Sequence, residues 1–347
     1  MKHLPNLYIL RLFLSLVVII YHLPLISATL KIPYYNSSPL FAKGELAVFY
    51  FFTLSGFLIL RLIHAELQKT NTFDFKTFYL RRITRLYPAY YLVFFIGVVL
   101  YHLILPYLGF AFDRKYPLSA LVLDYVFFIP NIFKHYYNPG SILIVLWSIG
   151  IEEQFYLFIP VFMFLFKRNV IQYISFLLLI LLIILFLFPQ FYVYQNFYFY
   201  FIFGGLLSSI SLQKKRAIFK NKALHIVVYL LFIFSFLTNV FESENIFIYH
   251  VFNMLISGLF ISLISDYPIF IVKNRFLDYL GKISYGVYVY HAIVFTGILF
   301  LVTKFKLYSY INPTLFIVLL NLLVIVITML VAHLSFKFFE SKFYRRK

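Results

Sequence analysis

The chain has 347 residues, of which 63% are hydrophobic and 12% are charged, and its formal net charge is +18. A water-soluble domain of this length could not bury so large an apolar share in one core. The composition therefore excludes an ordinary soluble protein and indicates an integral membrane protein. The absence of cysteine excludes disulfides, cysteine metal sites and a cysteine acyl-enzyme.

Apolar runs of about 20 residues, the length that spans ~30 Å of hydrocarbon, occur ten times along the chain. We expect membrane helices at approximately residues 7–27, 45–63, 86–108, 143–166, 170–188, 191–210, 223–241, 246–264, 283–302 and 314–336. These runs predict an all-α integral membrane bundle that forms a single domain over residues 1–347, with no soluble domain. A further apolar piece, residues 121–133, is too short to span and predicts an interfacial or re-entrant segment.

The distribution of Lys and Arg between the spans predicts the orientation of the chain. An N-terminus in the cytoplasm places 22 of them on the cytoplasmic side and seven on the other, as the positive-inside rule requires. Both termini should then be cytoplasmic. We expect the protein to lie in the cell membrane. Basic loops that face an anionic leaflet also account for the net charge better than nucleic-acid binding does.

The first span carries two ionisable residues, Arg11 and His22, in the run RLFLSLVVIIYH. Both oppose the alternative of a cleaved signal peptide, as does the length of the run. Eleven residues of helix place the two side chains within about 20° of the same direction and about 16 Å apart along the axis. The structural alternatives are a histidine hydrogen-bonded between helices and an arginine that snorkels to the interface. Their shared face favours function, because ionisable groups at membrane depth are costly.

Two further motifs follow. The second span contains FFTLSGFLI, in which Ser55 and Gly56 are small enough to let helices approach closely, a structural role. Just before the third span, RRITRLYPAY places Arg81, Arg82 and Arg85 on one side of a short helix that precedes Pro88. Membrane anchoring could explain these arginines, but three Arg without Lys suit bidentate phosphate recognition better.

The fourth and ninth spans also carry polar groups. In WSIGIEEQFYLFIP, Glu152 and Glu153 point about 100° apart, so at most one faces a given site, and both could instead pair with Arg or Tyr in the bundle. In GKISYGVYVYH, Ser284, Tyr288 and His291 form a stripe that is either a packing seam or one wall of a cavity. The remaining candidates have no companion pattern and are treated as structural: His102, His250 and His333.

These five motifs occur in this order along the whole chain, and with them the chain resembles the membrane acyltransferase 3 family of acyl-CoA-dependent O-acyltransferases. The resemblance implies a bundle of about ten helices. It also implies transfer of an acyl group, most often acetyl, from cytoplasmic acyl-CoA to a sugar hydroxyl of a surface polysaccharide or its lipid-linked precursor. We expect neither a metal cofactor nor a nucleic-acid partner.

The resemblance also assigns roles by motif position. His22 matches the family's essential first-helix histidine and Arg11 its basic partner. Arg82 and Arg85 match an Arg-x-x-Arg motif placed near the phosphates of CoA, where Arg81 is expected to help. Glu152 and His291 match two further motif positions, whose roles in the family are less settled.

A mechanism follows from these roles. A histidine, largely neutral at physiological pH, can act as general base on the acceptor hydroxyl. We expect His22 to do so, with Glu152 or Glu45 orienting its ring. Arg11 would stabilise negative charge on the thioester carbonyl or hold the pantetheine end of the donor.

The chain departs from the family pattern at two places, with Ala47 where a second glycine is common and aromatic residues over 198–203 where many members carry arginine. No fused esterase-like domain follows the last span, so we expect the chain to act alone or with a separate partner. Two alternatives remain open. Polar groups along one helix face also suit a transporter or flippase, although no internal repeat is evident. The acceptor could also be a lipid or a small metabolite.

Overall fold

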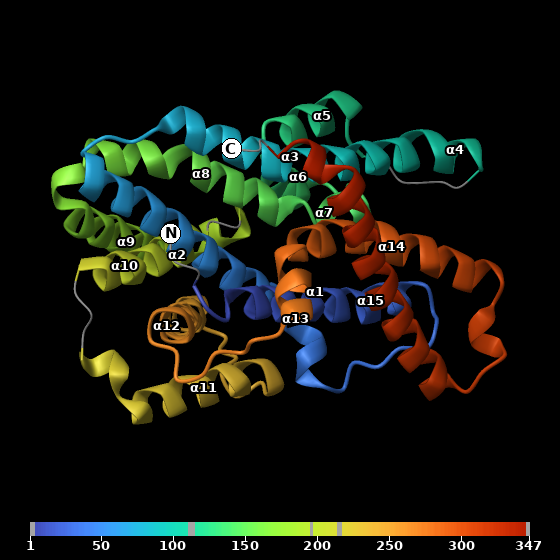
Figure 1. The fold of residues 1–347 in the computed structure, drawn as a ribbon. Helices are drawn as coiled ribbons and strands as arrows, with labels where there is room; N and C mark the ends of the chain where they lie inside the picture. Colours follow the sequence, from blue (N-terminus) through green and yellow to red (C-terminus); the bar gives the residue numbers. More distant parts are fainter. Residues whose placement is uncertain (1–3, 110–114, 195–196, 214–216, 345–347) are drawn as a thin grey trace. The chain divides into compact units, whose positions relative to one another are not determined.

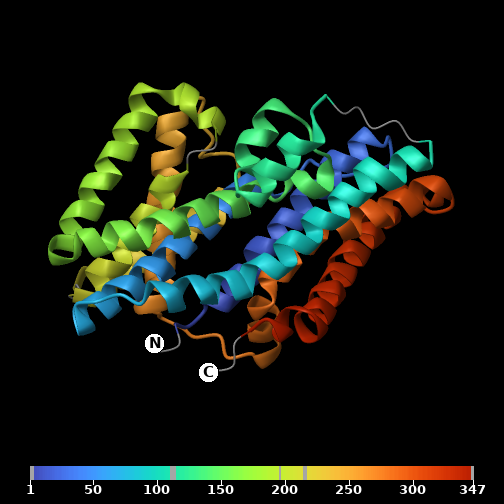
Figure 2. The ribbon, with the colours of Figure 1, turned by 90° about the horizontal axis from the view of Figure 1, so that it is seen from above.

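The computed structural model describes residues 4–109, 115–194, 197–213 and 217–344, and every regular element among them is helical (Figure 1, Figure 2). Within these ranges eight helices are long and apolar enough to cross a membrane, and two shorter apolar helices cover Tyr198–Leu212 and Lys222–Leu237. The predicted all-α fold with about ten spans is confirmed, and the chain is a multi-pass membrane protein. Its orientation stays a prediction. Several of the counted cations lie outside the described residues: Lys2, Arg114, Lys214, Lys215, Arg216, Arg345, Arg346 and Lys347.

The chain divides into two compact units, and each is described by itself. The first comprises Met1–Leu14, Ser38–Asp74 and Ile151–Gly281, and the second comprises Ser15–Ser37, Phe75–Gly150 and Lys282–Lys347. Three helices contribute residues to both units: α1 (Leu7–Thr29), α8 (Trp147–Leu165) and, by its last residue, α13 (Arg275–Lys282). The division into two units does not test the predicted single-domain organisation, which stays a prediction.

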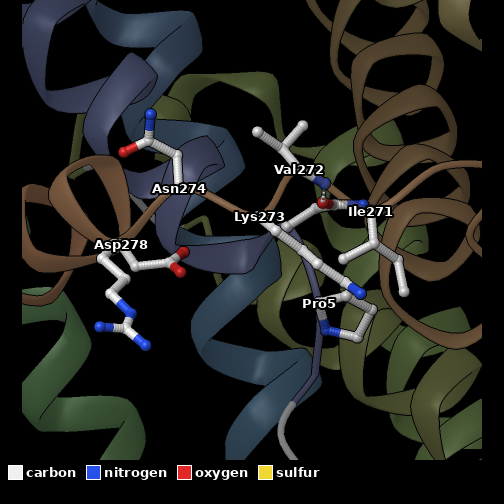
Figure 3. A pocket seen from close by; sticks show the side chains of 8 residues that line it. Pro5, Ile271, Val272, Lys273, Asn274 and Asp278 are labelled. Carbon is white, nitrogen blue, oxygen red and sulfur yellow. Dashed lines mark hydrogen bonds between the residues drawn. The ribbon is translucent and has the colours of Figure 1, made fainter.

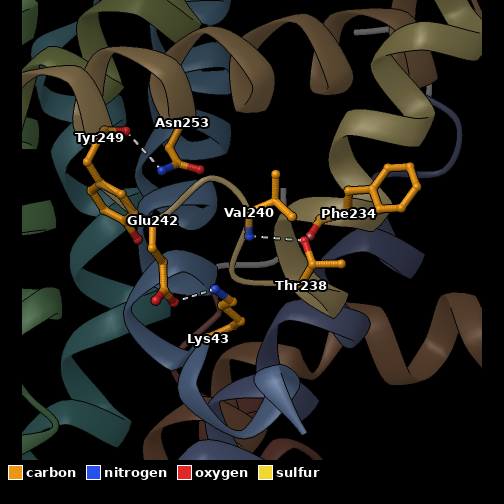
Figure 4. Close-up of polar contacts among 7 residues, drawn as sticks. All are labelled: Lys43, Phe234, Thr238, Val240, Glu242, Tyr249 and Asn253. Carbon is orange, nitrogen blue, oxygen red and sulfur yellow. Dashed lines mark hydrogen bonds and ion pairs between the residues drawn. The ribbon is translucent and has the colours of Figure 1, made fainter. Parts of the chain in front are cut away.

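The first unit is built around α2 (Gly44–Thr70), which packs against α10 and α12. At the start of α2, Lys43 forms a 2.7 Å ion pair with Glu242 in the loop between α11 and α12 (Figure 4). The other elements of this unit are η1 (Pro39–Ala42), η3 (Lys167–Asn169), α9 (Val170–Leu187), η4 (Pro189–Tyr194), α10 (Tyr198–Gln213), η5 (Ala217–Lys220), α11 (Lys222–Leu237), α12 (Ile246–Asp266) and α13 (Arg275–Lys282).

The contact between α2 and α10 depends on glycine. A Cβ atom added to Gly56 would lie 1.9 Å from the carbonyl oxygen of Phe201, and one added to Gly204 would lie 2.1 Å from the carbonyl oxygen of Thr53. Both obstacles are backbone atoms, which cannot move aside as the end of a side chain can. The predicted role of Gly56 in close helix approach is therefore confirmed.

We expect Gly56→Ala to lower the stability of the folded protein by about 1–3 kcal/mol, the usual effect of forcing extra atoms into a packed interior. The midpoint of thermal unfolding in detergent measures this. The matched control is Gly297→Ala in α14, where no heavy atom lies within 4 Å of the added Cβ. There the change should be neutral or stabilising, because alanine favours a helix. Equal midpoints for the two variants would show that the α2–α10 contact relaxes freely.

The second unit is centred on α14 (Ser284–Lys304), which packs against α15, α3 and α7. Figure 2 shows α14 and α15 side by side at the C-terminal end of the chain. The Tyr285 hydroxyl on α14 donates to the Leu86 carbonyl on α3 at 2.8 Å. The other elements are α3 (Phe75–Val99), η2 (Leu100–Ile104), α4 (Leu105–Tyr107), α5 (Leu118–Val126), α6 (Pro130–Tyr136), α7 (Ser141–Ile144), η6 (Leu307–Ser309), α15 (Pro313–Phe338) and η7 (Glu340–Lys342).

The start of the third span was predicted wrongly. Its helix begins at Phe75 rather than near residue 86, and it continues through Pro88. A proline removes only one backbone hydrogen bond, and membrane helices tolerate this loss. The three arginines therefore lie on the spanning helix itself. The apolar piece at residues 121–133 forms parts of α5 and α6, and both helices are too short to span, in agreement with an interfacial or re-entrant segment.

Candidate active site

Two histidines, one from α1 and one from α14, meet in the second unit. The ring centroids of His22 and His291 lie 5.2 Å apart, with 30° between the ring planes. Phe295, one turn further along α14, packs against both rings at 6.1 and 5.6 Å. His291 is fully buried. The structure thus brings together two residues that the sequence had singled out separately.

The hydrogen bonding of His291 fixes its tautomer. Its Nδ1–H donates to the backbone carbonyl of Tyr288. A carbonyl oxygen only accepts, so in the neutral ring Nδ1 carries the proton and Nε2 keeps its lone pair. Nε2 is buried and has no hydrogen-bond partner among the described residues. The ring stacked on His22 therefore offers a basic nitrogen that no protein donor occupies.

Tyr288 and Lys134 also lie near this pair, and the ring centroid of Tyr288 is 5.8 Å from that of His291. The Tyr288 hydroxyl and Ser148 Oγ form a 2.6 Å hydrogen bond. Lys134 Nζ lies 4.6 Å from the ring centroid of Trp147, and the Lys134 charge acts on His22. Lys134, a cation between two predicted spans, was not singled out from the sequence. No local pattern could have marked it, because its neighbours are distant in the sequence.

The arginines at the start of α3 differ in environment. Arg81 is exposed, whereas Arg82 and Arg85 are partly buried. The Arg82 guanidinium carbon lies 5.7 Å from the ring centroid of Phe78. Arg85 lies close enough to Glu340, a carboxylate only 3% exposed, for the two charges to attract.

Glu340 is the second residue that the sequence analysis missed. Ser335 Oγ donates to Glu340 Oε1 at 2.9 Å, and the Tyr290 hydroxyl bonds Ser335 Oγ at 2.6 Å. Because the Ser335 proton is used on the carboxylate, Tyr290 must be the donor to Ser335. A signal was present in the sequence, since Glu340 is the only acidic residue after Asp278, in a segment that is otherwise basic.

The remaining predicted residues lie on helices of the first unit. Arg11 is partly buried on α1, and α1 is one helix from Leu7 through Thr29, as the shared face of Arg11 and His22 requires. The Glu152 carboxylate accepts hydrogen bonds from Ser55 Oγ at 2.5 Å and from the Tyr156 hydroxyl. Glu45 is exposed in the first turn of α2.

A metal site would need several ligand side chains close together. Over the parts of the chain that the structure describes, no group of three or more His, Asp or Glu side chains lies close enough together to hold a metal ion. The side chains described above offer two imidazoles, a nearby ammonium group and a separate cluster of guanidinium groups.

A family model described as an acyltransferase domain matches residues 4–333. The chain belongs to this acyltransferase family. The resemblance inferred from the five motifs is thereby confirmed. Membership in an acyltransferase family favours acyl transfer over the transporter or flippase alternative.

Two of the relatives that the chain resembles are named as O-acetyltransferases. The chain is 28% identical to the O-acetyltransferase OatA of Staphylococcus aureus (strain NCTC 8325 / PS 47), over 98% of this chain and 57% of the relative. It is 33% identical over 181 residues to the peptidoglycan O-acetyltransferase OatA of Listeria monocytogenes, which is 49% of this chain and 25% of the relative. This acyltransferase chain thus spans little more than half the length of its staphylococcal relative. No solved structure matches it.

Proposed function

We propose that the chain transfers an acetyl or similar acyl group from cytoplasmic acyl-CoA to a sugar hydroxyl of a surface polysaccharide or its lipid-linked precursor. The stacked pair of His22 and His291, with a buried basic nitrogen left open, carries the proposal. The glycan acceptor is suggested by a relative named for peptidoglycan O-acetylation. The enzyme would act in the cell membrane with both termini in the cytoplasm.

His22 acts as the general base in this reaction. It takes the proton of the acceptor hydroxyl as the oxygen attacks the thioester carbonyl carbon. The new C–O bond forms, the C–S bond breaks, and the thiolate of CoA leaves with the electron pair. The imidazolium then returns the proton to the thiolate, so the products are the sugar ester and CoA as the free thiol.

His291 orients the acceptor. Its Nε2 can accept a hydrogen bond from a sugar hydroxyl beside the His22 ring, because Nδ1–H is held by the Tyr288 carbonyl. The two rings cannot both be charged at low cost. Two unit charges 5.2 Å apart repel by about 3 kcal/mol at an effective dielectric constant of about 20. The pair therefore takes up only one additional proton at a time, which suits transfer of a single proton from hydroxyl to thiolate.

Two cations have separate roles. Lys134, whose charge acts on His22, stabilises the negative oxygen that develops on the thioester carbonyl. Arg11 is about 16 Å from His22 along α1, too far to contact the same oxygen. Of the two roles expected for Arg11, holding the pantetheine end of the donor fits better.

The arginines of α3 bind the phosphates of CoA. Arg82 and Arg85 supply guanidinium groups for bidentate contacts, with the exposed Arg81 beside them. The Tyr285 contact joins α14 to α3 at Leu86, next to Arg85, and His291 lies six residues or about 9 Å further along α14. An extended donor arm can therefore run along α14 from the arginines to the histidines.

Glu340 positions Arg85 for this task. We expect Glu340→Gln to raise the KM for acyl-CoA about 5–10-fold, or about 1–1.4 kcal/mol, with a smaller change in kcat. Glutamine keeps an acceptor for Ser335 but removes the charge that holds the guanidinium group. Steady-state kinetics against acyl-CoA measure both constants. A lower KM would mean instead that Glu340 repels the phosphates, and an unchanged KM would remove Arg85 from the donor site.

The role of Glu152 stays a prediction. Hydrogen bonds from Ser55 and Tyr156 hold its carboxylate in a fixed position, which a residue that orients another side chain needs. Glu45 is the alternative, and its exposure favours Glu152.

Release of free CoA thiol tests the proposed reaction against transport. The chain is reconstituted in vesicles with acetyl-CoA, and the thiol is measured by a colorimetric reagent before and after glycan fragments are added. An acyltransferase releases thiol in proportion to the acceptor, whereas a transporter or flippase releases none. Mass spectrometry of the acylated product separates a glycan acceptor from a lipid or small metabolite.

A further inference from the structure

The segment between α12 and α13 is held against the start of the chain in the first unit. Asn6 Nδ2 donates to the carbonyls of Ile264 at 3.1 Å and Phe270 at 2.9 Å, and the Val272 N–H donates to Asn6 Oδ1 at 3.1 Å. One amide side chain therefore joins the last turn of α12 to the middle of this segment.

Helix α13 is also held against the start of the chain, by close packing at a glycine. A Cβ atom at Gly281 would lie 2.0 Å from the carbonyl oxygen of Tyr8, so only glycine lets α13 lie so close to α1. Hydrogen bonds to Asn6 and close packing on Tyr8 thus hold the segment and α13 against the N-terminal residues.

A pocket of about 340 Å³ lies between these parts (Figure 3). In Figure 3 the Lys273 side chain runs towards Pro5 and Ile271, and the Asp278 carboxylate points towards the same space. The residues that line it are Pro5, Asn6, Ile271, Val272, Lys273, Asn274, Arg275 and Asp278.

The pocket carries one more positive charge than negative. Lys273 and Arg275 face a single carboxylate, Asp278, and none of the three forms an ion pair within 4.0 Å in the described part of the chain. Asp266, the last residue of α12, does not line the pocket, and Arg61 binds both of its oxygens at 2.7 and 2.9 Å.

The backbone amides at the start of α13 are also occupied. Asn274 Oδ1 accepts from the N–H groups of Phe276 and Leu277 at 3.0 and 3.1 Å. Anion binding in this pocket would therefore come from the Lys273 and Arg275 side chains and not from the helix end.

Apolar side chains of the same segment are exposed beside the pocket. Phe270, Ile271 and Phe276 are 56%, 52% and 67% exposed. The segment begins directly after α12, a candidate membrane span that ends at Asp266, so it lies at the level of the membrane interface. Exposed apolar groups next to uncompensated cations are the arrangement that binds a lipid surface. A site for a free anion does not need exposed apolar side chains.

We infer that this pocket binds the phosphate group of an anionic phospholipid, with Lys273 and Arg275 on the phosphodiester and the exposed apolar residues among the acyl chains. The excess of one positive charge matches a headgroup that carries one negative charge. The site is separate from the proposed acyl transfer and does not depend on it. On the proposed orientation, it lies in the cytoplasmic leaflet.

Native mass spectrometry of the purified full chain tests the site. The protein is titrated with phosphatidylglycerol or with phosphatidylcholine, and the number and affinity of bound lipids are measured. We expect the double variant Lys273→Gln/Arg275→Gln to lose one tight phosphatidylglycerol site or to weaken it at least 10-fold. The charge-matched control is Lys69→Gln/Lys76→Gln, two exposed cations outside the pocket that should leave binding unchanged.

A third variant removes a negative charge from the pocket instead of a positive one. Asp278→Asn removes the only acid of the pocket and should strengthen phosphatidylglycerol binding about 2–3-fold. Unchanged binding in the double variant, or equal losses in the control, would overturn the site. Competition by inorganic phosphate or by CoA as effective as that of the lipid would overturn the lipid as its ligand.

Discussion

His22→Ala lowers kcat for acyl transfer by about 10²–10⁴-fold, the usual contribution of a positioned general base. The KM for acyl-CoA should change little, because the proposed phosphate contacts are made by arginines of α3. The measurement is the initial rate of CoA thiol release with saturating glycan acceptor. Protein amount and thermal unfolding midpoint are determined on the same preparations.

The matched control for this variant is His333→Ala, a partly buried histidine of α15 for which no catalytic role is proposed. It should keep most of the wild-type rate. If His22→Ala retains full activity, His22 is not the base. If both variants lose activity together with their unfolding midpoint, the effect of His22 is on folding.

His291→Asn is the second large effect, with an expected loss of about 10²-fold in kcat/KM for the acceptor. The asparagine amide can take the place of Nδ1–H and still donate to the Tyr288 carbonyl. It has no atom at the position of Nε2, the nitrogen proposed to accept from the sugar. The variant therefore separates a structural histidine from one that contacts the acceptor.

His291→Gln serves as the companion variant, because its amide reaches the Nε2 position and offers an oxygen as acceptor. We expect it to recover part of the activity that His291→Asn loses. Wild-type kinetics for His291→Asn would show that the bond to Tyr288 is all that matters. Full loss in both variants with a normal KM for the acceptor would assign His291 to the proton path and not to acceptor binding.

Local patterns in the sequence predicted the helices and the shared face of Arg11 and His22, because both depend only on the helical period and the thickness of the membrane. The family resemblance was carried by motifs of the same local kind. The start of α3 was predicted wrongly because the span was placed where the apolar run begins, after the arginines, although the chain is helical from Phe75.

Contacts between distant parts of the chain could not be predicted in this way. His22 and His291 were each marked by their own span, but nothing in one sequence states that α1 and α14 bring their rings together. Lys134 was missed for the same reason, since its significance comes from His22 in space, whereas the lone acidic Glu340 was marked by its basic segment and only its link to Arg85 was hidden. Gly56 was found because a small residue in an apolar helix has few other uses.

The fate of a labelled acetyl group tests the central claim most directly. Vesicles that contain wild-type protein or His22→Ala are given acetyl-CoA labelled in the acetyl carbon together with peptidoglycan-derived glycan fragments. The proposed reaction places the label in an alkali-labile ester on a sugar hydroxyl with wild-type protein, and almost none with His22→Ala. Label that stays on CoA with active wild-type protein, or equal labelling of the glycan by both proteins, would contradict it.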